Sequence, residues 1–328
     1  MKSHLTVLFS SAGRRVELLN CFREDARQLG LVLRVLAVDC DPAMSSACQS
    51  ADHSLAVPRC GDAFFIPRLL EICAAERVDL VVPTIDTELL PLAEARHKFE
   101  AIGTRVAVSD LETVAMARDK LRTSAFLERH GISSPRTVPA KALLENPDAL
   151  RFPVILKKID GSSSIGLREA AGINEVRDPQ IDLTRYIAQE KWIGREYTVN
   201  LFFDDAGHCR AAVPHLRCEV RAGEVSKGVT VRHPLLTDFA ARLADALPGA
   251  RGALCFQSII TADGRGVVFE INARFGGGYP LAHRSGARFS RWLLEELAGI
   301  TSSATDGWDE GVTMLRYDAA VFVGTPRK

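Results

Sequence analysis

The stretch that most constrains the fold is residues 252–280, GALCFQSIITADGRGVVFEINARFGGGYP. Two apolar runs, LCFQSII and GVVFEINARF, flank Asp263-Gly264, a dipeptide typical of hairpin turns. The pattern therefore predicts two antiparallel strands joined by a tight turn. This pairing places Gln257 opposite the part of the second strand that carries Glu270.

Polar residues alternate along the second of these strands. Because successive side chains point to opposite faces, we predict Glu270, Asn272 and Arg274 on one face and Phe269 and Ile271 on the other. A carboxylate and amide oxygens suit Mg²⁺, and a guanidinium suits the phosphoryl oxygens of a nucleotide that the metal leaves uncovered. The alternative is a polar hairpin edge that is simply solvated.

Length and composition favour a protein of several domains that acts on small molecules. The 328 residues suffice for two or three domains, and 47% hydrophobic with 25% charged residues is ordinary for a soluble protein. Lys plus Arg equals Asp plus Glu at 41 each, so no overall field attracts nucleic acid or an anionic membrane. We expect no signal peptide and no membrane span. The eight cysteines form no CxxC pair, which favours reduced thiols in a cytoplasmic protein.

The N-terminal third alternates apolar strands with amphipathic helices. Strands are predicted at residues 4–10, 33–39 and 80–84, and helices at 14–29, 68–76 and 88–99. This alternation predicts right-handed βαβ units and a doubly wound parallel sheet. Ligands bind beyond the carboxyl ends of such strands, where residues 10–13, Asp39, Asp41 and Asp86 fall. The serine-rich turn could bind an anion or cap its helix, and the aspartates could hold an amine or cap loops.

A lysine followed by small residues stands near the middle of the chain. Lys157 ends the predicted strand PVILK, and residues 160–166, DGSSSIG, form the loop after it. One cation and several backbone N–H groups can surround a polyphosphate. The motif differs from a Walker A loop, because here the lysine precedes the loop. The alternative is a glycine-serine hairpin beside an exposed lysine.

An extended segment that contains tryptophan, QEKWIGREYTV, occupies residues 189–199. Such a segment can offer backbone groups to adenine, with Trp192 and Ile193 against the ring faces and the Glu196 carboxylate near the ribose. The alternative is an edge strand. Beyond it we predict further elements, with antiparallel strands at 198–203, 211–220, 226–232 and 314–323 and helices at 234–246 and from 279 to 297.

Taken in order, four elements of the sequence resemble those of the ATP-grasp superfamily. The choice of Gln, Glu, Asn and Arg in the hairpin is most similar to the carbamoyl-phosphate synthase large-chain branch of that superfamily. The four elements are Lys120 before the exit GISSP, PVILK with its loop, QEKWIGREYTV, and EINAR with Gln257 before it. The resemblance implies that Lys157 bridges phosphates and that Arg274 stabilises the transferring phosphoryl group, which makes both catalytic. It assigns the nucleotide to Lys120, Lys157, Gly161, Ser162, Ser163, Ser164, Gly166, Glu190, Lys191, Trp192, Ile193 and Glu196. It assigns Mg²⁺ to Gln257, Glu270 and Asn272.

The same resemblance implies a fold in three parts. Residues 1–112 would form a Rossmann-like domain, 113–193 a small α+β lobe with the glycine- and serine-rich lid, and 194–328 a C-terminal α+β lobe with the metal site. ATP and Mg²⁺, with Mn²⁺ as the other candidate ion, are the implied cofactors. The implied enzyme is a ligase that activates a carboxylate as an acyl phosphate, forms ADP, and joins the acyl group to an amine of an amino acid or a small peptide-like substrate.

Two other activities stay open on the sequence alone. One is bicarbonate activation of the carbamoyl-phosphate type, although the chain has a single such unit and lacks the pattern of an amidotransferase. The other is a catalytically silent nucleotide-binding module, against which the complete set of lysines and metal ligands argues. The sequence does not identify the carboxylate or the amine, and it is compatible with a homodimer.

Overall fold

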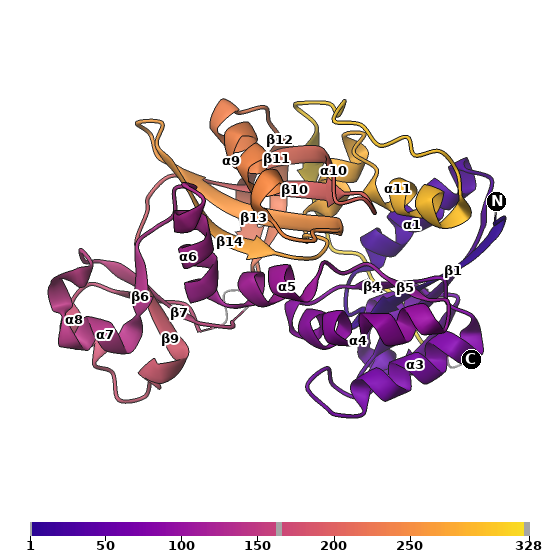
Figure 1. The fold of residues 1–328 in the computed structure, drawn as a ribbon, viewed down its shortest axis with the longest axis horizontal. Helices are drawn as coiled ribbons and strands as arrows, with labels where there is room; N and C mark the ends of the chain where they lie inside the picture. The colour runs from indigo at the N-terminus through magenta and orange to yellow at the C-terminus, as the bar shows by residue number, and fades with distance from the viewer. Residues whose placement is uncertain (1, 162–165, 325–328) are drawn as a thin grey trace.

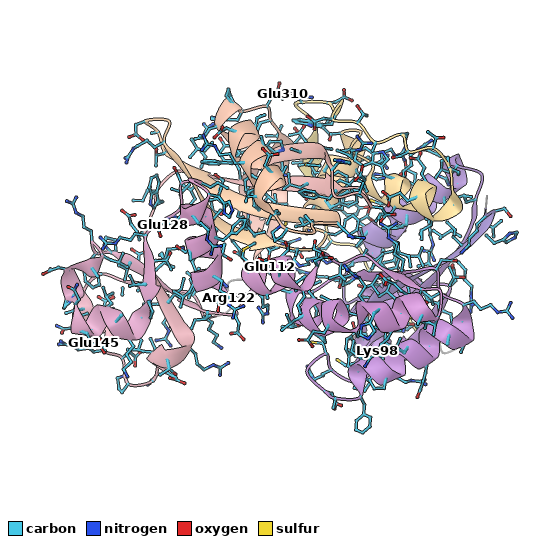
Figure 2. All side chains as sticks on the ribbon, viewed as in Figure 1. Lys98, Glu112, Arg122, Glu128, Glu145 and Glu310 are labelled. Atoms are coloured by element: carbon cyan, nitrogen blue, oxygen red, sulfur yellow. The ribbon has the colours of Figure 1, made fainter. Side chains whose placement is uncertain are left out.

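The computed structural model describes residues 2–161 and 166–324. Its strands form three sheets, which we call the N-terminal sheet, the small sheet and the large sheet. In Figure 1 the small sheet projects to the left, the large sheet lies along the top, and the N-terminal sheet lies at the lower right. Charged side chains such as Lys98, Glu128 and Glu145 lie on the outside of these parts (Figure 2). No helix in the described ranges combines the length and the apolar composition needed to cross a membrane.

The N-terminal sheet is parallel throughout. Its order is β3-β2-β1-β4-β5, from β1 (His4–Ser10), β2 (Val32–Asp39), β3 (His53–Ala56), β4 (Leu80–Pro83) and β5 (Arg105–Val106). The connections contain α1 (Val16–Gln28), η1 (Pro42–Met44), α2 (Ser46–Ser50), α3 (Phe65–Glu76), η2 (Asp86–Glu88) and α4 (Leu89–Ala101). The direction of winding reverses between β1 and β4, so the carboxyl ends of these two strands border the crevice where ligands bind in such sheets.

Helices cover both faces of this sheet, which confirms the predicted doubly wound fold. On β1, Val7 belongs to one apolar cluster with Phe22 of α1, whereas the next residue, Leu8, belongs to another with Leu69 of α3 and Leu92 of α4. A parallel strand buried on both faces must be apolar at consecutive positions, and these residues are all fully buried.

The small sheet is antiparallel and has its own core. It runs β6-β9-β7-β8, from β6 (Thr137–Pro139), β7 (Val154–Lys158), β8 (Arg168–Ala170) and β9 (Tyr186–Glu190). The helices α7 (Ala140–Glu145) and α8 (Ile173–Val176), with the short η3 (Pro147–Ala149) and η4 (Leu183–Arg185), accompany these strands. Apolar side chains such as Leu143, Val154 and Val176 form a separate cluster beneath them.

The large sheet is antiparallel and contains the predicted hairpin. Its order is β14-β13-β10-β11-β12-β15, from β10 (Arg195–Phe203), β11 (Cys209–Arg221), β12 (Glu224–Thr230), β13 (Gly252–Ile260), β14 (Gly266–Asn272) and β15 (Thr313–Leu315). The helices of this part are α9 (Pro234–Ala246), α10 (Tyr279–Arg284) and α11 (Phe289–Ala298). With the parallel sheet before it, this arrangement confirms the predicted fold class.

Two predictions about the C-terminal part were wrong. The helix expected from 279 to 297 is divided into α10 and α11, because Gly286 between them adopts a positive φ of 105°. The strand expected at 314–323 is limited to β15, which lies at the edge of the large sheet. The apolar residues after it, including Phe322 at 92% exposure, find no strand or helix to pack against among the described residues.

Two helices connect the parts of the chain. They are α5 (Leu111–Arg118) and α6 (Lys120–Arg129), and Asp119 between them caps α6 by accepting hydrogen bonds from the backbone of Leu121 at 2.8 Å and Arg122 at 3.1 Å. Phe126 of α6 shares an apolar cluster with Phe256 of β13. The helix that begins at Lys120 is therefore held against the large sheet. The domain boundaries at 112/113 and 193/194 stay predictions.

Candidate active site

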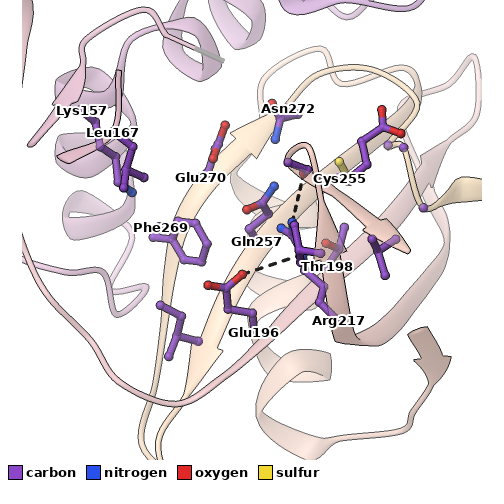
Figure 3. Close-up of a pocket in the computed structure, with 18 of the residues that line it drawn as sticks. Lys157, Leu167, Glu196, Thr198, Arg217, Cys255, Gln257, Phe269, Glu270 and Asn272 are labelled. Carbon is purple, nitrogen blue, oxygen red and sulfur yellow. Dashed lines mark hydrogen bonds and ion pairs between the residues drawn. The ribbon is translucent and has the colours of Figure 1, made fainter. Parts of the chain in front are cut away.

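A cavity of about 840 Å³ is lined by residues of all three parts of the chain. The small sheet contributes Lys157 and Gln189, the large sheet contributes Gln257 and Glu270, and the N-terminal part contributes Arg15. Figure 3 shows Lys157 on one side and Glu270 and Gln257 on the other. The strands that carry these groups are fixed in sheets, so the polar side chains are held in place by rigid elements.

The predicted metal ligands lie together on the hairpin. Gln257 of β13 is the direct register partner of Glu270 of β14, and Asn272 lies two residues further along. All three side chains line the cavity. This set is one carboxylate and two amides, and no group of three or more His, Cys, Asp or Glu side chains elsewhere in the described chain could hold a metal. One carboxylate with neutral oxygens fits Mg²⁺ that shares its other ligand positions with phosphate oxygens.

The predicted orientation of Phe269 was wrong. Gln257 pairs with Glu270 while the next residue, Ser258, pairs with Val268, so Phe269 is an extra residue in β14. Such a bulge breaks the strict alternation of side chains. Phe269 consequently lines the cavity beside Glu270, and its ring lies 4.9 Å from the Lys157 amino group.

The two predicted phosphate-binding lysines are half-buried, and the Glu270 carboxylate acts on both of them. Lys157 Nζ donates a 2.8 Å hydrogen bond to Gln189 Oε1, and Lys120 Nζ donates a 2.6 Å bond to the Gly161 carbonyl oxygen. Burial lowers the pKa of Lys157 to about 8, although the Glu270 carboxylate partly opposes this effect. Burial also lowers the pKa of Lys120. Two cations kept in a partly dehydrated site are suited to bind an anion with high charge density.

The predicted lid is only partly described by the structure. Gly161 lines the cavity, and Gly166 adopts a positive φ of 78°. Ser162, Ser163 and Ser164 lie outside the described residues. Leu167, which we did not predict, lines the cavity immediately after this loop. No composition signal marks it, because an isolated leucine after a loop is ordinary.

The segment after β9 also borders the cavity. Glu190, Lys191, Trp192 and Glu196 all line it. Trp192 Nε1 donates to Glu190 Oε2 at 3.1 Å. Lys191 Nζ lies 2.7 Å from Glu169, and Glu196 Oε2 lies 3.9 Å from Arg217 Nε.

Ile193 differs from its neighbours in this segment. It is 77% exposed and is not among the residues that line the cavity. The adjacent Gly194 passes so close to β13 that a Cβ there would stand 2.2 Å from the Ile260 carbonyl oxygen. Contact of Ile193 with adenine stays a prediction.

Arg274 joins the hairpin to the N-terminal part of the chain. Its Nη2 donates to Asp86 Oδ2 at 2.8 Å, and its Nη1 donates to the Phe275 carbonyl oxygen at 3.0 Å. Burial by itself would lower the pKa of Arg274, but Asp86, Cys255 and Glu270 together raise it above its ordinary value. Asp86 therefore binds a guanidinium, whereas the sequence left it as an amine ligand or a loop cap.

The carboxyl ends of β1 and β4 are organised by a buried glutamate. Glu88 accepts hydrogen bonds from the Thr84 backbone N–H at 2.7 Å and from Ser11 Oγ at 2.9 Å. Burial raises the pKa of Glu88, while these hydrogen bonds lower it. Asp39 accepts a 2.8 Å bond from the Gly13 backbone N–H. Glu88 and Asp39 therefore fix the loops that surround Arg15.

Glycines close the floor of the cavity after β14. A Cβ on Gly277 would stand 2.6 Å from the Glu224 carboxyl carbon, and one on Gly278 would stand 2.6 Å from His215 Nε2. Burial lowers the pKa of His215 to about 3, so it packs here as a neutral ring. The sequence indicated a glycine turn, but it gave no sign that Glu224 or His215 would lie beneath it.

Two family descriptions match this chain. Residues 117–278, which contain the lysines, the hairpin and the glycine turn, match the family described as "ATP-grasp domain". Residues 7–107 match "PylC-like, N-terminal domain". Residues 117–278 therefore belong to the ATP-grasp family. The resemblance to ATP-grasp proteins inferred from the motifs is confirmed.

Individual relatives of this ATP-grasp protein are distant. A carbamoyl-phosphate synthase from Methanobrevibacter smithii is 28% identical over 123 residues, which are 35% of this chain and 34% of that protein. A D-alanine–D-alanine ligase from Pseudomonas putida is 28% identical over 230 residues, 63% of this chain and 71% of that protein. A solved structure with a similar fold is the biotin carboxylase domain of the Hydrogenobacter thermophilus 2-oxoglutarate carboxylase, in complex with MgADP, ADP and bicarbonate. Its TM-score is 0.74 at 13% sequence identity, and the match covers 93% of this chain and 72% of that one. The chain thus spans about a third of the carbamoyl-phosphate synthase it matches.

Proposed function

We propose that this protein is an ATP-dependent ligase that activates a carboxylate as an acyl phosphate and joins it to an amine. The observation that carries the proposal is one cavity in which Lys120, Lys157, Glu270, Asn272 and Arg274 converge. Phosphoryl transfer needs little covalent chemistry from a protein, and it depends on positioning and on charge stabilisation. The cavity offers both, and the reaction needs no nucleophilic side chain of the protein.

Each group has a defined part in this reaction. Gln257, Glu270 and Asn272 would hold Mg²⁺, which when bound offsets the charge of the nucleotide phosphates. Lys157 and Lys120 would bind those phosphates from the opposite side. The structural relative that contains MgADP supports the same cofactors here.

The arginine would act where charge develops. Asp86 holds Arg274 at the end of the hairpin, so its guanidinium is oriented before the substrate arrives. As the terminal phosphoryl group moves from ATP to the carboxylate oxygen, Arg274 would stabilise the charge on the phosphoryl oxygens. An amine then attacks the acyl carbon, phosphate leaves with the bonding electron pair, and the amine loses its proton.

The choice between an organic carboxylate and bicarbonate depends on the relatives. The D-alanine–D-alanine ligase matches over 71% of its own length, whereas the carbamoyl-phosphate synthase matches over 34%. This difference favours an organic acid, with an amino acid or small peptide-like molecule as the substrate. Bicarbonate activation is the second candidate, because the structural relative described above contains bicarbonate.

The test is release of ADP and phosphate from MgATP in the presence of pooled amino acids, pooled other carboxylates, or bicarbonate. Hydroxylamine is added to trap the acyl phosphate as a hydroxamate. The proposal predicts ADP release with a pool of organic acids, together with a hydroxamate that identifies the acid. Release with bicarbonate alone would support the second candidate, and no release under any condition would refute both.

A matched pair of variants tests the metal assignment within the same assay. Glu270→Gln removes the only carboxylate of the ligand set, and we expect it to abolish Mg²⁺-dependent ADP release. Glu145→Gln makes the same chemical change on the outer side of the small sheet (Figure 2), and we expect it to retain the rate of the unaltered protein. Near-normal turnover by Glu270→Gln would contradict the assignment.

A further inference from the structure

The end of the cavity next to the N-terminal sheet contains more guanidinium groups than carboxylates. Glu224 lies 3.4 Å from Arg15 Nη1, 2.9 Å from Arg316 Nη1 and 3.5 Å from Arg14 Nη2. One carboxylate thus faces three cations. The guanidinium groups of Arg15 and Arg316 lower the pKa of Glu224 although burial opposes them, so it remains an anion and cannot neutralise all three.

Arg15 is the least exposed of these three arginines, and it is the one that lines the cavity. Its side chain is 16% exposed, compared with 63% for Arg14. Within the described residues its guanidinium makes two contacts, both long, at 3.4 Å to Glu224 and at 3.3 Å to the Thr84 carbonyl oxygen. A guanidinium has five N–H donors, and a buried cation is stable only when it is paired. The burial and the long contacts indicate that Arg15 has donors available for an anion in the cavity.

Arg15 and the expected phosphate-binding Lys157 lie on different parts of the cavity wall, because Arg15 precedes α1 of the N-terminal part and Lys157 lies on β7 of the small sheet. The charges that shift the pKa of Lys157 are those of Glu270, Lys120 and Glu196. The charges that shift the pKa of Arg15 are different, namely those of Glu224, Arg274, Asp86 and Arg316. Burial lowers the pKa of Arg15, and Glu224 partly opposes this effect.

Arg274 also lines the cavity, but it has a partner of its own. Its Nη2 is occupied by Asp86 at 2.8 Å, and it lies next to the metal ligand Asn272 at 3.4 Å. Arg274 is therefore placed to act at the phosphoryl group. Arg15, on the loop after β1, instead contacts the Thr84 carbonyl oxygen just after β4 of the N-terminal sheet, and Glu224 at the start of β12.

We infer that Arg15 binds a substrate carboxylate that is not the one phosphorylated. The planar fork of a guanidinium matches a carboxylate in a two-pronged contact. A substrate of this class is an amino acid acceptor, whose own carboxylate remains after its amine reacts, or a dicarboxylic acid donor. The inference rests on the proposed ligase function and specifies the class of substrate that this function uses.

The experiment compares acids with their amides in the ligase assay. Each amino acid acceptor that supports ADP release is compared with its carboxamide, and each dicarboxylate donor with its monoamide. The unaltered protein should prefer the free acid by about 10- to 150-fold in kcat/KM, the range expected for a hydrogen-bonded charge pair. Preference for the acid in the acceptor series identifies an amino acid, and preference in the donor series identifies a dicarboxylate.

The variants Arg15→Gln and Arg14→Gln test whether Arg15 is responsible for the preference for the free acid over the amide. Arg15→Gln should bring the acid-to-amide ratio close to one while the KM for MgATP is unchanged. Arg14→Gln removes a neighbouring cation that contacts Glu224 without lining the cavity, and it should keep the ratio of the unaltered protein. Equilibrium binding of MgATP and a thermal unfolding curve confirm that each variant is folded.

The possible failures are distinguishable. If the unaltered protein releases no ADP with any pool, the proposed ligase function is wrong. If ADP is released but the substrate has no second carboxylate, or Arg15→Gln keeps the full preference for the acid, the inference about Arg15 is wrong and the ligase function stands. Loss of the preference in both variants would mean that overall positive charge, and not Arg15, is responsible, which also overturns the inference.

Discussion

Replacing Asp86 with alanine removes the carboxylate that pairs with Arg274 and leaves the guanidinium without a counter-ion. The two side chains are 12% and 13% exposed, so solvent cannot replace the lost partner fully. Breaking a buried ion pair by deleting one partner costs about 3–5 kcal/mol. We expect the lower end, about 3 kcal/mol, because Arg274 retains its bond to the Phe275 carbonyl oxygen at 3.0 Å.

This cost is measurable by urea denaturation and by thermal unfolding. At about 2.1 cal/mol/K of unfolding entropy per residue, 3 kcal/mol lowers the Tm of a 328-residue chain by roughly 4 °C. The double variant Asp86→Ala with Arg274→Met should be more stable than Asp86→Ala alone, because it removes the unpaired charge as well. Asp86→Asn keeps the size of the side chain and isolates the contribution of the charge.

The kinetic result follows from the same contact. If Asp86 orients Arg274, kcat in Asp86→Ala should fall while the KM for MgATP changes little, because the lysines that bind phosphates are intact. A double variant less stable than Asp86→Ala, or an unchanged unfolding free energy in Asp86→Ala, would refute the reasoning.

Two further predictions concern the lysine and the glycine turn. Because burial lowers the pKa of Lys157 to about 8, its cation is lost as the pH rises through that value, and kcat/KM for MgATP should decrease above about pH 8. In Lys157→Arg this decrease should be absent from the pH profile, since arginine stays charged. Gly278→Ala places a Cβ 2.6 Å from His215 Nε2 and should cost about 1–3 kcal/mol of unfolding free energy, measured in urea. Gly61→Ala, where nothing lies within 4 Å of the new Cβ, is the control and should change it little.

The regular parts of the fold could be predicted because they follow from local pattern. The apolar runs of β1 and β2 and the turn before β14 determine their own structure, and the register that pairs Gln257 with Glu270 follows from the turn. The order of lysines, hairpin and glycines was sufficient to predict the family. These features depend on residues that are close in sequence.

The remaining features depend on contacts between distant residues. Arg274 and Asp86 are 188 positions apart, and no local signal pairs them. The orientation of Phe269 was wrong because a single extra residue in one strand is invisible in an alternating pattern. Arg15 lies in a turn that the sequence did indicate, but its burial depends on Glu224 in a different sheet. The strand predicted after residue 314 was too long because apolar residues indicate a strand only where a partner exists.

The central claim is that a carboxylate oxygen becomes bonded to the terminal phosphorus of ATP. The most direct measurement uses the substrate acid labelled with ¹⁸O in its carboxylate and analyses the released phosphate by mass spectrometry. An acyl phosphate carries one carboxylate oxygen into phosphate when the amine attacks the acyl carbon. The account therefore predicts one ¹⁸O in each phosphate released during ligation. Phosphate without label, formed at the same rate as product, would contradict it.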